Sequence, residues 1–128
     1  EVAAHGEGEA LARDTLLSGR ALNKLRAICE AQGGFLTPQL AQHTRTINAE
    51  RNGIVGFINN RLVARLAKLA GAPAAKGAGV YLHTHLGRRV ERGEVMMTVY
   101  AETPGELAYA LEFYDSHREM LRVEDESV

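Results

Sequence analysis

In the first quarter of the chain, apolar residues recur at helical intervals and predict two consecutive helices. Leucines alternate with alanines and charged residues over residues 7–17, and the pair Ser18–Gly19 ends that run. A second run covers residues 18–34. Four of its apolar residues fall on one helical face, and these are Leu22, Leu25, Ile28 and Cys29. We expect Ser18 to cap the second helix at its start and the Gly33–Gly34 pair to end it.

The pattern changes after residue 34, and we place a domain boundary near Phe35. Residues 35–49 contain a proline and scattered polar residues, and then alternate in polarity over Thr44–Ala49. This predicts a linker that leads into a strand. The stretch Gly53–Ile58, GIVGFI, is rich in β-branched and aromatic residues, as buried strands are, and its glycines permit a bulge or a close backbone approach.

Helical periodicity returns in the stretch NNRLVARLAKLAGAP, residues 59–73. Its leucines form one stripe, made of Leu62, Leu66 and Leu69. We expect Asn60 to be the N-cap of this helix, Gly71 to end it and Pro73 to follow just beyond.

Two predicted strands, at residues 77–87 and 94–102, flank the polar turn RRVERG. Glycines at both corners of the turn, Gly87 and Gly93, allow the chain to bend sharply. Four side chains are expected to point inward, and these are Leu82, Val90, Met97 and Val99.

The last predicted helix follows Thr103, which is expected to cap it, with Pro104 at the first helical position. Leu107, Leu111 and Tyr114 share one face of this helix. The acidic tail, residues 122–128, is expected to fray. The predicted fold class is α+β: two helices, followed by a unit of strands with inserted and appended helices.

Composition narrows the functional class. A chain of 128 residues with a formal net charge of −1 is not predicted to bind nucleic acid, and no apolar run has the length of a bilayer span. The single cysteine, Cys29, cannot form an internal disulfide, so we expect a buried, inert thiol and a cytoplasmic protein. The absence of methionine at Glu1 is expected if the chain is part of a longer protein, and processing explains it equally well.

The turn at residues 87–94 has the glycine and valine spacing with which biotinyl and lipoyl carrier domains build half of a flattened barrel. Such domains attach their cofactor to a lysine on the following hairpin. The corresponding stretch here, YAETPGE, has none, and the lysines of the chain lie elsewhere, at Lys24, Lys68 and Lys76. We therefore interpret the turn as architecture and expect no cofactor.

Other polar residues offer only incomplete sites. His83 and His85 are expected to share a face of one strand, but that strand has no cysteine or carboxylate to complete a metal site. The arginines around residue 90 alternate with glutamates, which favours a solvated turn, with a phosphate or partner contact as the alternative. The glycines at 77 and 79 resemble a phosphate-binding loop only in composition, since they precede a strand. We assign no catalytic, cofactor-binding or metal-ligating residue.

Three stretches together, at residues 18–34, 47–73 and 77–102, are similar in order and spacing to the C-terminal part of the thymidine and pyrimidine-nucleoside phosphorylases. The segments NNRLVARLAKLAGAP and YAE most resemble the branch of AMP phosphorylases and bacterial type 2 thymidine phosphorylases. The resemblance implies that residues 1–34 are the last helices of an α/β domain. It also implies that residues 35–128 form the C-terminal α+β domain, built on a barrel-sandwich.

The family reaction is phosphorolysis of a nucleoside or a nucleoside monophosphate to base and sugar phosphate. The family's phosphate and base motifs lie upstream and match no position here, so the resemblance implies a supporting role in a homo-oligomeric enzyme, with no catalysis by this chain alone. It also implies a histidine at His83, whereas relatives often have basic residues where Thr84 and His85 stand. The alternative is a free-standing, lysine-less barrel-sandwich module that docks on another protein, which would have little need of the helices before Phe35.

Overall fold

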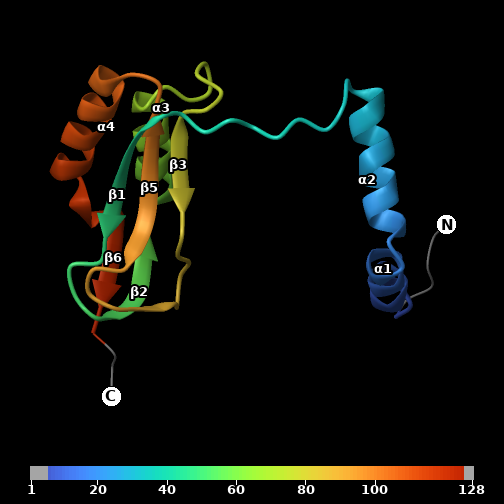
Figure 1. Cartoon of the computed structure of the whole chain (residues 1–128). Coiled ribbons are helices and arrows are strands. Elements are labelled where there is room, and N and C mark those ends of the chain that lie inside the picture. The colour runs from blue at the N-terminus through green and yellow to red at the C-terminus, as the bar shows by residue number, and fades with distance from the viewer. Residues whose placement is uncertain (1–5, 126–128) are drawn as a thin grey trace. The chain divides into compact units, whose positions relative to one another are not determined.

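A computed structural model describes residues 6–125 of the chain, which divides into two compact units between Thr37 and Pro38. The predicted α+β class is confirmed, because the described residues contain helices and two small antiparallel sheets (Figure 1). None of the helices within residues 6–125 combines the length and the apolar composition that crossing a bilayer requires.

The first unit consists of α1 (Gly8–Leu17) and α2 (Arg20–Ala31), as the periodicity predicts. The predicted cap is wrong, because Gly19 occupies the N-cap position of α2 with a φ of 79°. Ser18 instead ends α1, where its hydroxyl lies 3.4 Å from the carbonyl oxygen of Thr15. The helices are joined so tightly that the chain needs a left-handed residue between them, which favours glycine.

Cys29 is half-buried, so the prediction of a fully buried thiol is wrong. Neither α1 nor α2 has a buried residue. The apolar face of α2 therefore has no core beneath it within this unit. The predicted stop is present, because Gly33 and Gly34 both have positive φ angles and the Gly34 amide donates to the carbonyl of Cys29 at 2.8 Å.

The first sheet of the second unit has the strand order β1-β5-β3. Its strands are β1 (His43–Asn48), β5 (Val95–Ala101) and β3 (Gly79–Leu82), and all pairing is antiparallel. The predicted strand over residues 77–87 is too long, because β3 ends at Leu82. The Leu82 side chain is 37% exposed, so the expectation that it points inward is also wrong.

The second sheet has the order β4-β2-β6, with strands β4 (Arg89–Val90), β2 (Gly53–Ile58) and β6 (Leu121–Glu124). Part of the tail that was expected to fray is strand β6, which pairs with β2 across the register Val55↔Val123. Residues 126–128 lie outside the described residues. The partner that orders β6 is nearly 70 residues away in sequence, which a local pattern cannot reveal.

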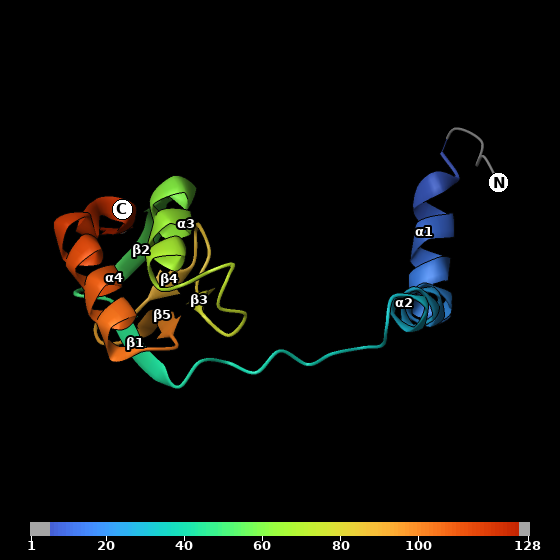
Figure 2. The ribbon, with the colours of Figure 1, turned by 90° about the horizontal axis from the view of Figure 1, so that it is seen from above.

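Helices α3 (Asn60–Leu69) and α4 (Pro104–Ser116) pack against each other and lie alongside the strands (Figure 2). The cap of α3 is Asn59 rather than Asn60, because its side-chain oxygen accepts from the amides of Arg61 and Leu62. A short 3₁₀ helix, η1 (Arg118–Met120), connects α4 to β6.

Among residues 6–125, the buried core lies in the second unit and draws on both of its sheets and on α3, α4 and η1. Its members are Ile47, Ala49, Val55, Leu66, Ala70, Val90, Met96, Met97, Val99, Ala101, Ala110, Met120 and Leu121. The predicted stripe of α3 faces this core, with Leu66 fully buried and Leu62 and Leu69 packed beside it. Residues 38–128 therefore possess a core of their own.

Replacing Thr103 with alanine is expected to lower the free energy of unfolding by about 1 kcal/mol. The Thr103 hydroxyl accepts from the Glu106 amide at 3.2 Å, and the Glu106 carboxylate accepts from the Thr103 amide at 3.2 Å, which is a complete capping box. Urea denaturation measures the loss. Thr103→Ser keeps the hydroxyl and is the control, so an equal loss in both variants would show that the cap contributes nothing.

Candidate functional site

The bend between β3 and β5 connects the two sheets. The Gly87 amide donates to the carbonyl of Val55 at 2.8 Å, and the Gly93 amide donates to the carbonyl of Ala49 at 2.8 Å. Both glycines have the positive φ angles that the sequence predicts, 81° and 88°. Between these two glycines the chain forms β4, which pairs with β2 in the second sheet. The residues of this bend therefore connect the first sheet to the second.

The two histidines of this bend lie beyond the end of β3, so the prediction that they share a strand face is wrong. His83 Nε2 is 2.8 Å from Thr98 Oγ1, and the His83 ring also contacts Tyr81. His85 Nδ1 is 2.9 Å from the carbonyl oxygen of Leu86. Among the described residues, no group of three histidines, cysteines or carboxylates lies close enough to hold a metal ion.

We predict that zinc does not bind specifically to this pair of histidines, because two ligands leave a tetrahedral zinc ion incompletely coordinated. Calorimetric titration of zinc into chelator-treated protein should give no stoichiometric, sub-micromolar binding. Tight binding at one zinc per chain that disappears in His85→Ala would contradict this prediction.

Arg88, which lies within the bend, contacts two groups of the same chain. Arg88 donates to the carbonyl oxygen of His83 and forms an ion pair with Glu94. Glu94 also accepts from the backbone amide of Glu91 at 3.1 Å. These contacts favour a structural role for Arg88 over a phosphate contact.

Gly77, the first glycine of the pair at 77 and 79, lies where two backbone segments approach closely. The carbonyl oxygen of Gly77 accepts from the amide of Ala41 at 2.9 Å. A Cβ atom at this position would lie 2.6 Å from the carbonyl oxygen of Gln39. Gly77 is therefore needed where the start of the second unit crosses this loop.

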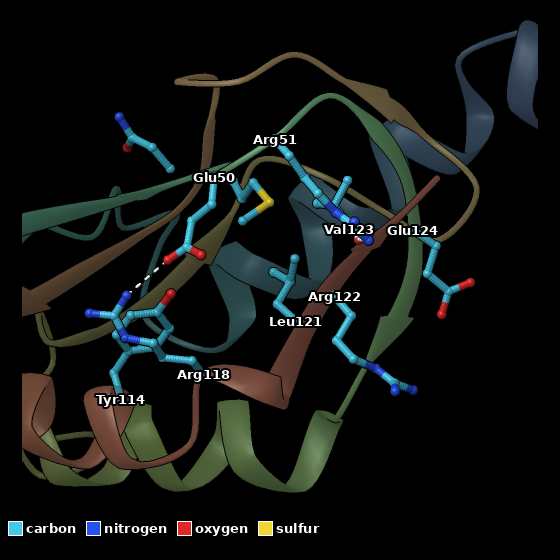
Figure 3. A pocket seen from close by; sticks show the side chains of 10 residues that line it. Glu50, Arg51, Tyr114, Arg118, Leu121, Arg122, Val123 and Glu124 are labelled. Carbon is cyan, nitrogen blue, oxygen red and sulfur yellow. Dashed lines mark hydrogen bonds and ion pairs between the residues drawn. The ribbon is translucent and has the colours of Figure 1, made fainter. Parts of the chain in front are cut away.

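A hollow of about 400 Å³ opens beside β6 (Figure 3). The buried residues Met96 and Leu121 are among those that line it. Arg51 reaches across it and donates to the carbonyl oxygen of Val123 at 2.9 Å. This hollow is not visible in the sequence, because its walls come from the β1–β2 connection, α4, η1 and β6, which are far apart along the chain.

Arg118, beside this hollow, is paired with two carboxylates. Arg118 forms an ion pair with Glu50 at 2.8 Å and another with Asp115 at 2.7 Å. The hydrogen bond with Asp115 raises the pKa of Arg118, and burial raises the pKa of the Tyr114 phenol, although nearby Arg118 opposes that rise. Arg51 and Arg118 thus tie the β1–β2 connection to β6 and η1, and these contacts help to hold the last strand in place.

The helical unit presents a different kind of surface. Leu22, Leu25 and Ile28 follow one face of α2 and are 50%, 49% and 46% exposed. Apolar side chains in a row on one helix mark a surface that another part of a protein covers. We call these three residues the α2 apolar face.

Comparison with known proteins gives a consistent result. Residues 54–120, half of the chain, match the model of the pyrimidine nucleoside phosphorylase C-terminal domain. A protein of Hahella chejuensis named "Putative thymidine phosphorylase" is 57% identical over 99% of this chain and 25% of its own length. Proteins with the same name from Sphingopyxis alaskensis and Chelativorans sp. are 50% and 49% identical over 96% and 95% of this chain, and 24% of each relative. The chain spans about a quarter of the length of these relatives.

Proposed function

Because this chain belongs to the family of pyrimidine nucleoside phosphorylase C-terminal domains, we propose that it forms the C-terminal part of a thymidine or AMP phosphorylase. The proposed reaction of the complete enzyme is a glycosyl transfer. Phosphate attacks the anomeric carbon of a nucleoside or nucleoside monophosphate, and the products are the free base and a sugar phosphate. We further propose that the enzyme is a homo-oligomer and that it is cytoplasmic. A cytoplasmic location suits a chain with one unpaired cysteine.

The observation that carries this proposal is the match with the thymidine phosphorylase relatives. Identity of 57% extends over nearly the whole chain, including the helices before residue 35, and it covers only a quarter of the relative. A module that shared only the second unit with these enzymes would not match them through α1 and α2. We therefore propose that residues 1–34 are the terminal helices of the α/β domain and that residues 35–128 are the C-terminal domain.

The proposed role of the chain is structural support. The second unit has a complete core, and the polar clusters described above hold its own strands and loops in place. The α2 apolar face lacks such a core and is the proposed attachment to the rest of the parent enzyme.

A free-standing interaction module is the second candidate, because residues 38–128 bury a core without help from the first unit. The stretch that corresponds to the lysine-bearing hairpin of a carrier domain, YAETPGE at residues 100–106, contains no lysine. This candidate gives the α2 apolar face no partner, so the state of α2 distinguishes the two proposals.

We predict that the amides of α2 exchange with solvent at least about a hundredfold more slowly in the complete protein than in the 128-residue chain. The reason is that the parent enzyme covers Leu22, Leu25 and Ile28, whereas the chain alone leaves them exposed. Hydrogen exchange followed by mass spectrometry compares the two proteins, and peptides from β5 are the internal control because their burial does not depend on the parent. Equal exchange of α2 in both proteins would contradict the proposal and favour the module.

A further inference from the structure

A second surface, on helices α3 and α4, has unpaired positive charge. Arg61, Arg65 and Lys68 recur at intervals of four and three residues, so they form one stripe along α3. All three are exposed, and α3 contains no acidic residue. Within residues 6–125 none of the three forms an ion pair, whereas several other arginines of the chain do. The stripe therefore lacks an acidic partner inside the described chain.

Aromatic residues follow the neighbouring stripe of α4. Tyr109, Phe113 and His117 recur every four residues. The rings of Phe113 and His117 stack with centroids 4.2 Å apart, and the guanidinium of Arg65 lies 5.4 Å from the centroid of Phe113. These contacts hold Arg65 over the boundary between the two helices.

A crevice of about 230 Å³ runs between the two stripes. Arg65 and Leu69 line it from α3, Tyr109, Glu112, Phe113 and Ser116 line it from α4, and His117 lines it just beyond α4. Tyr109, a large aromatic residue beside the crevice, is 63% exposed. The crevice has room for one more apolar side chain. Tyrosine and arginine around a small hollow of mixed polarity are residue types enriched in protein interaction surfaces.

We propose that this α3–α4 face, defined by Arg61, Arg65, Lys68, Tyr109, Phe113 and His117, docks against the remaining part of the parent chain. The docking partner presents acidic side chains to the basic stripe and one apolar side chain to the crevice. This inference rests on the proposed function, since it requires a parent enzyme, but it concerns a surface that the family match does not assign.

Two observations select this occupant. About three quarters of the length of the relatives lies outside this chain, and that length provides a tethered partner at high local concentration. The positive charge of the stripe is complementary to an acidic partner surface. Exposed pairs contribute little to stability individually, so their role here is to set which surface docks and in what orientation.

The test measures access to the crevice. Ser116 lies at its edge and is exposed, and residues 38–128 contain no cysteine, so Ser116→Cys introduces a single reporter thiol in that unit. The isolated unit serves as the reference because it has its own core. We expect the thiol at position 116 to react with a maleimide at least about tenfold more slowly in the complete protein than in the isolated unit. Peptide mass spectrometry reads this site separately from other cysteines.

Charge reversal provides the specificity control. The double variant Arg61→Glu and Lys68→Glu is expected to restore fast labelling in the complete protein and to leave the isolated unit unchanged. The matched control is Arg92→Glu, which reverses an exposed charge in the β4–β5 turn and should not restore labelling.

Three results would overturn the docking proposal. They are equal labelling of both proteins, slow labelling that depends on protein concentration and so reports a second copy, and restoration by Arg92→Glu as much as by the double variant. Phosphorolysis is assayed on the same preparations. An active enzyme with an open crevice refutes the docking surface alone, whereas an inactive protein with a covered crevice refutes the phosphorylase assignment alone.

Discussion

Replacing Gly53 with alanine is expected to lower the free energy of unfolding of the second unit by about 3 kcal/mol or more. Gly53 begins β2 with a φ of 154°, a conformation that residues with a side chain rarely adopt. A Cβ atom there would lie well inside van der Waals distance of the Glu124 carbonyl oxygen and 2.9 Å from Val123 Cγ1. The carbonyl belongs to the backbone of β6, so the clash can be relieved only by moving that strand.

Gly105→Ala is the matched control for this prediction. Gly105 lies in the first turn of α4, and a Cβ atom there would meet no atom within 4 Å. The same chemical change should therefore leave stability unchanged or raise it by about 0.5 kcal/mol. Urea denaturation compares the two variants, and a Gly53→Ala protein as stable as Gly105→Ala would show that β6 does not hold its place as the structure indicates.

Helices were predictable because their signals are local. The leucine stripe of α3 and the capping box of Thr103 and Glu106 lie within a few residues of the elements they specify. The errors at the helix starts are also local, since Asn59 rather than Asn60 caps α3, and Gly19 rather than Ser18 precedes α2. In both places adjacent residues offered competing caps, and backbone geometry decided between them.

Strand pairing was less predictable because the partners are distant. Residues 88–93 were predicted as a turn between two strands, but Arg89 and Val90 form the short strand β4, which pairs with β2 in the other sheet. Similarly, the acidic composition of the tail favoured fraying, whereas pairing with Val55 and the hydrogen bond from Arg51 order residues 121–124. Neither contact leaves a periodic signal in the sequence.

Among the candidate surfaces, too, features within one helix were predictable from the sequence and features that join distant segments were not. The α2 apolar face was visible as a helical stripe, although only the structure showed that no core lies beneath it. The hollow beside β6 and the crevice beside Tyr109 were missed, since each joins segments brought together by the fold. The resemblance to the nucleoside phosphorylases rested on three stretches of sequence taken together. The match to the C-terminal domain of that family over residues 54–120 confirms it.

The rate of phosphorolysis is expected to differ more between the complete protein and the 128-residue chain than any other property predicted above. We expect the complete protein to accelerate release of free base by roughly a millionfold or more over the uncatalysed reaction, the lower range for enzymes. The 128-residue chain should give no acceleration. A phosphate nucleophile must be held against the anomeric carbon by positioned cationic or amide donors. Of the arginines around the hollow beside β6, Arg118 is paired with carboxylates, Arg51 donates to a backbone carbonyl, and Arg122 lies over the ring of Phe57.

The decisive measurement is release of free base from thymidine, uridine, AMP and CMP in excess phosphate, with the complete protein and the 128-residue chain assayed in parallel. Our account predicts turnover of at least one substrate by the complete protein and none by the chain, and the preference between AMP and thymidine then identifies the branch. Turnover by the 128-residue chain would contradict its supporting role, and a folded complete protein inactive on all four substrates would contradict the phosphorylase assignment.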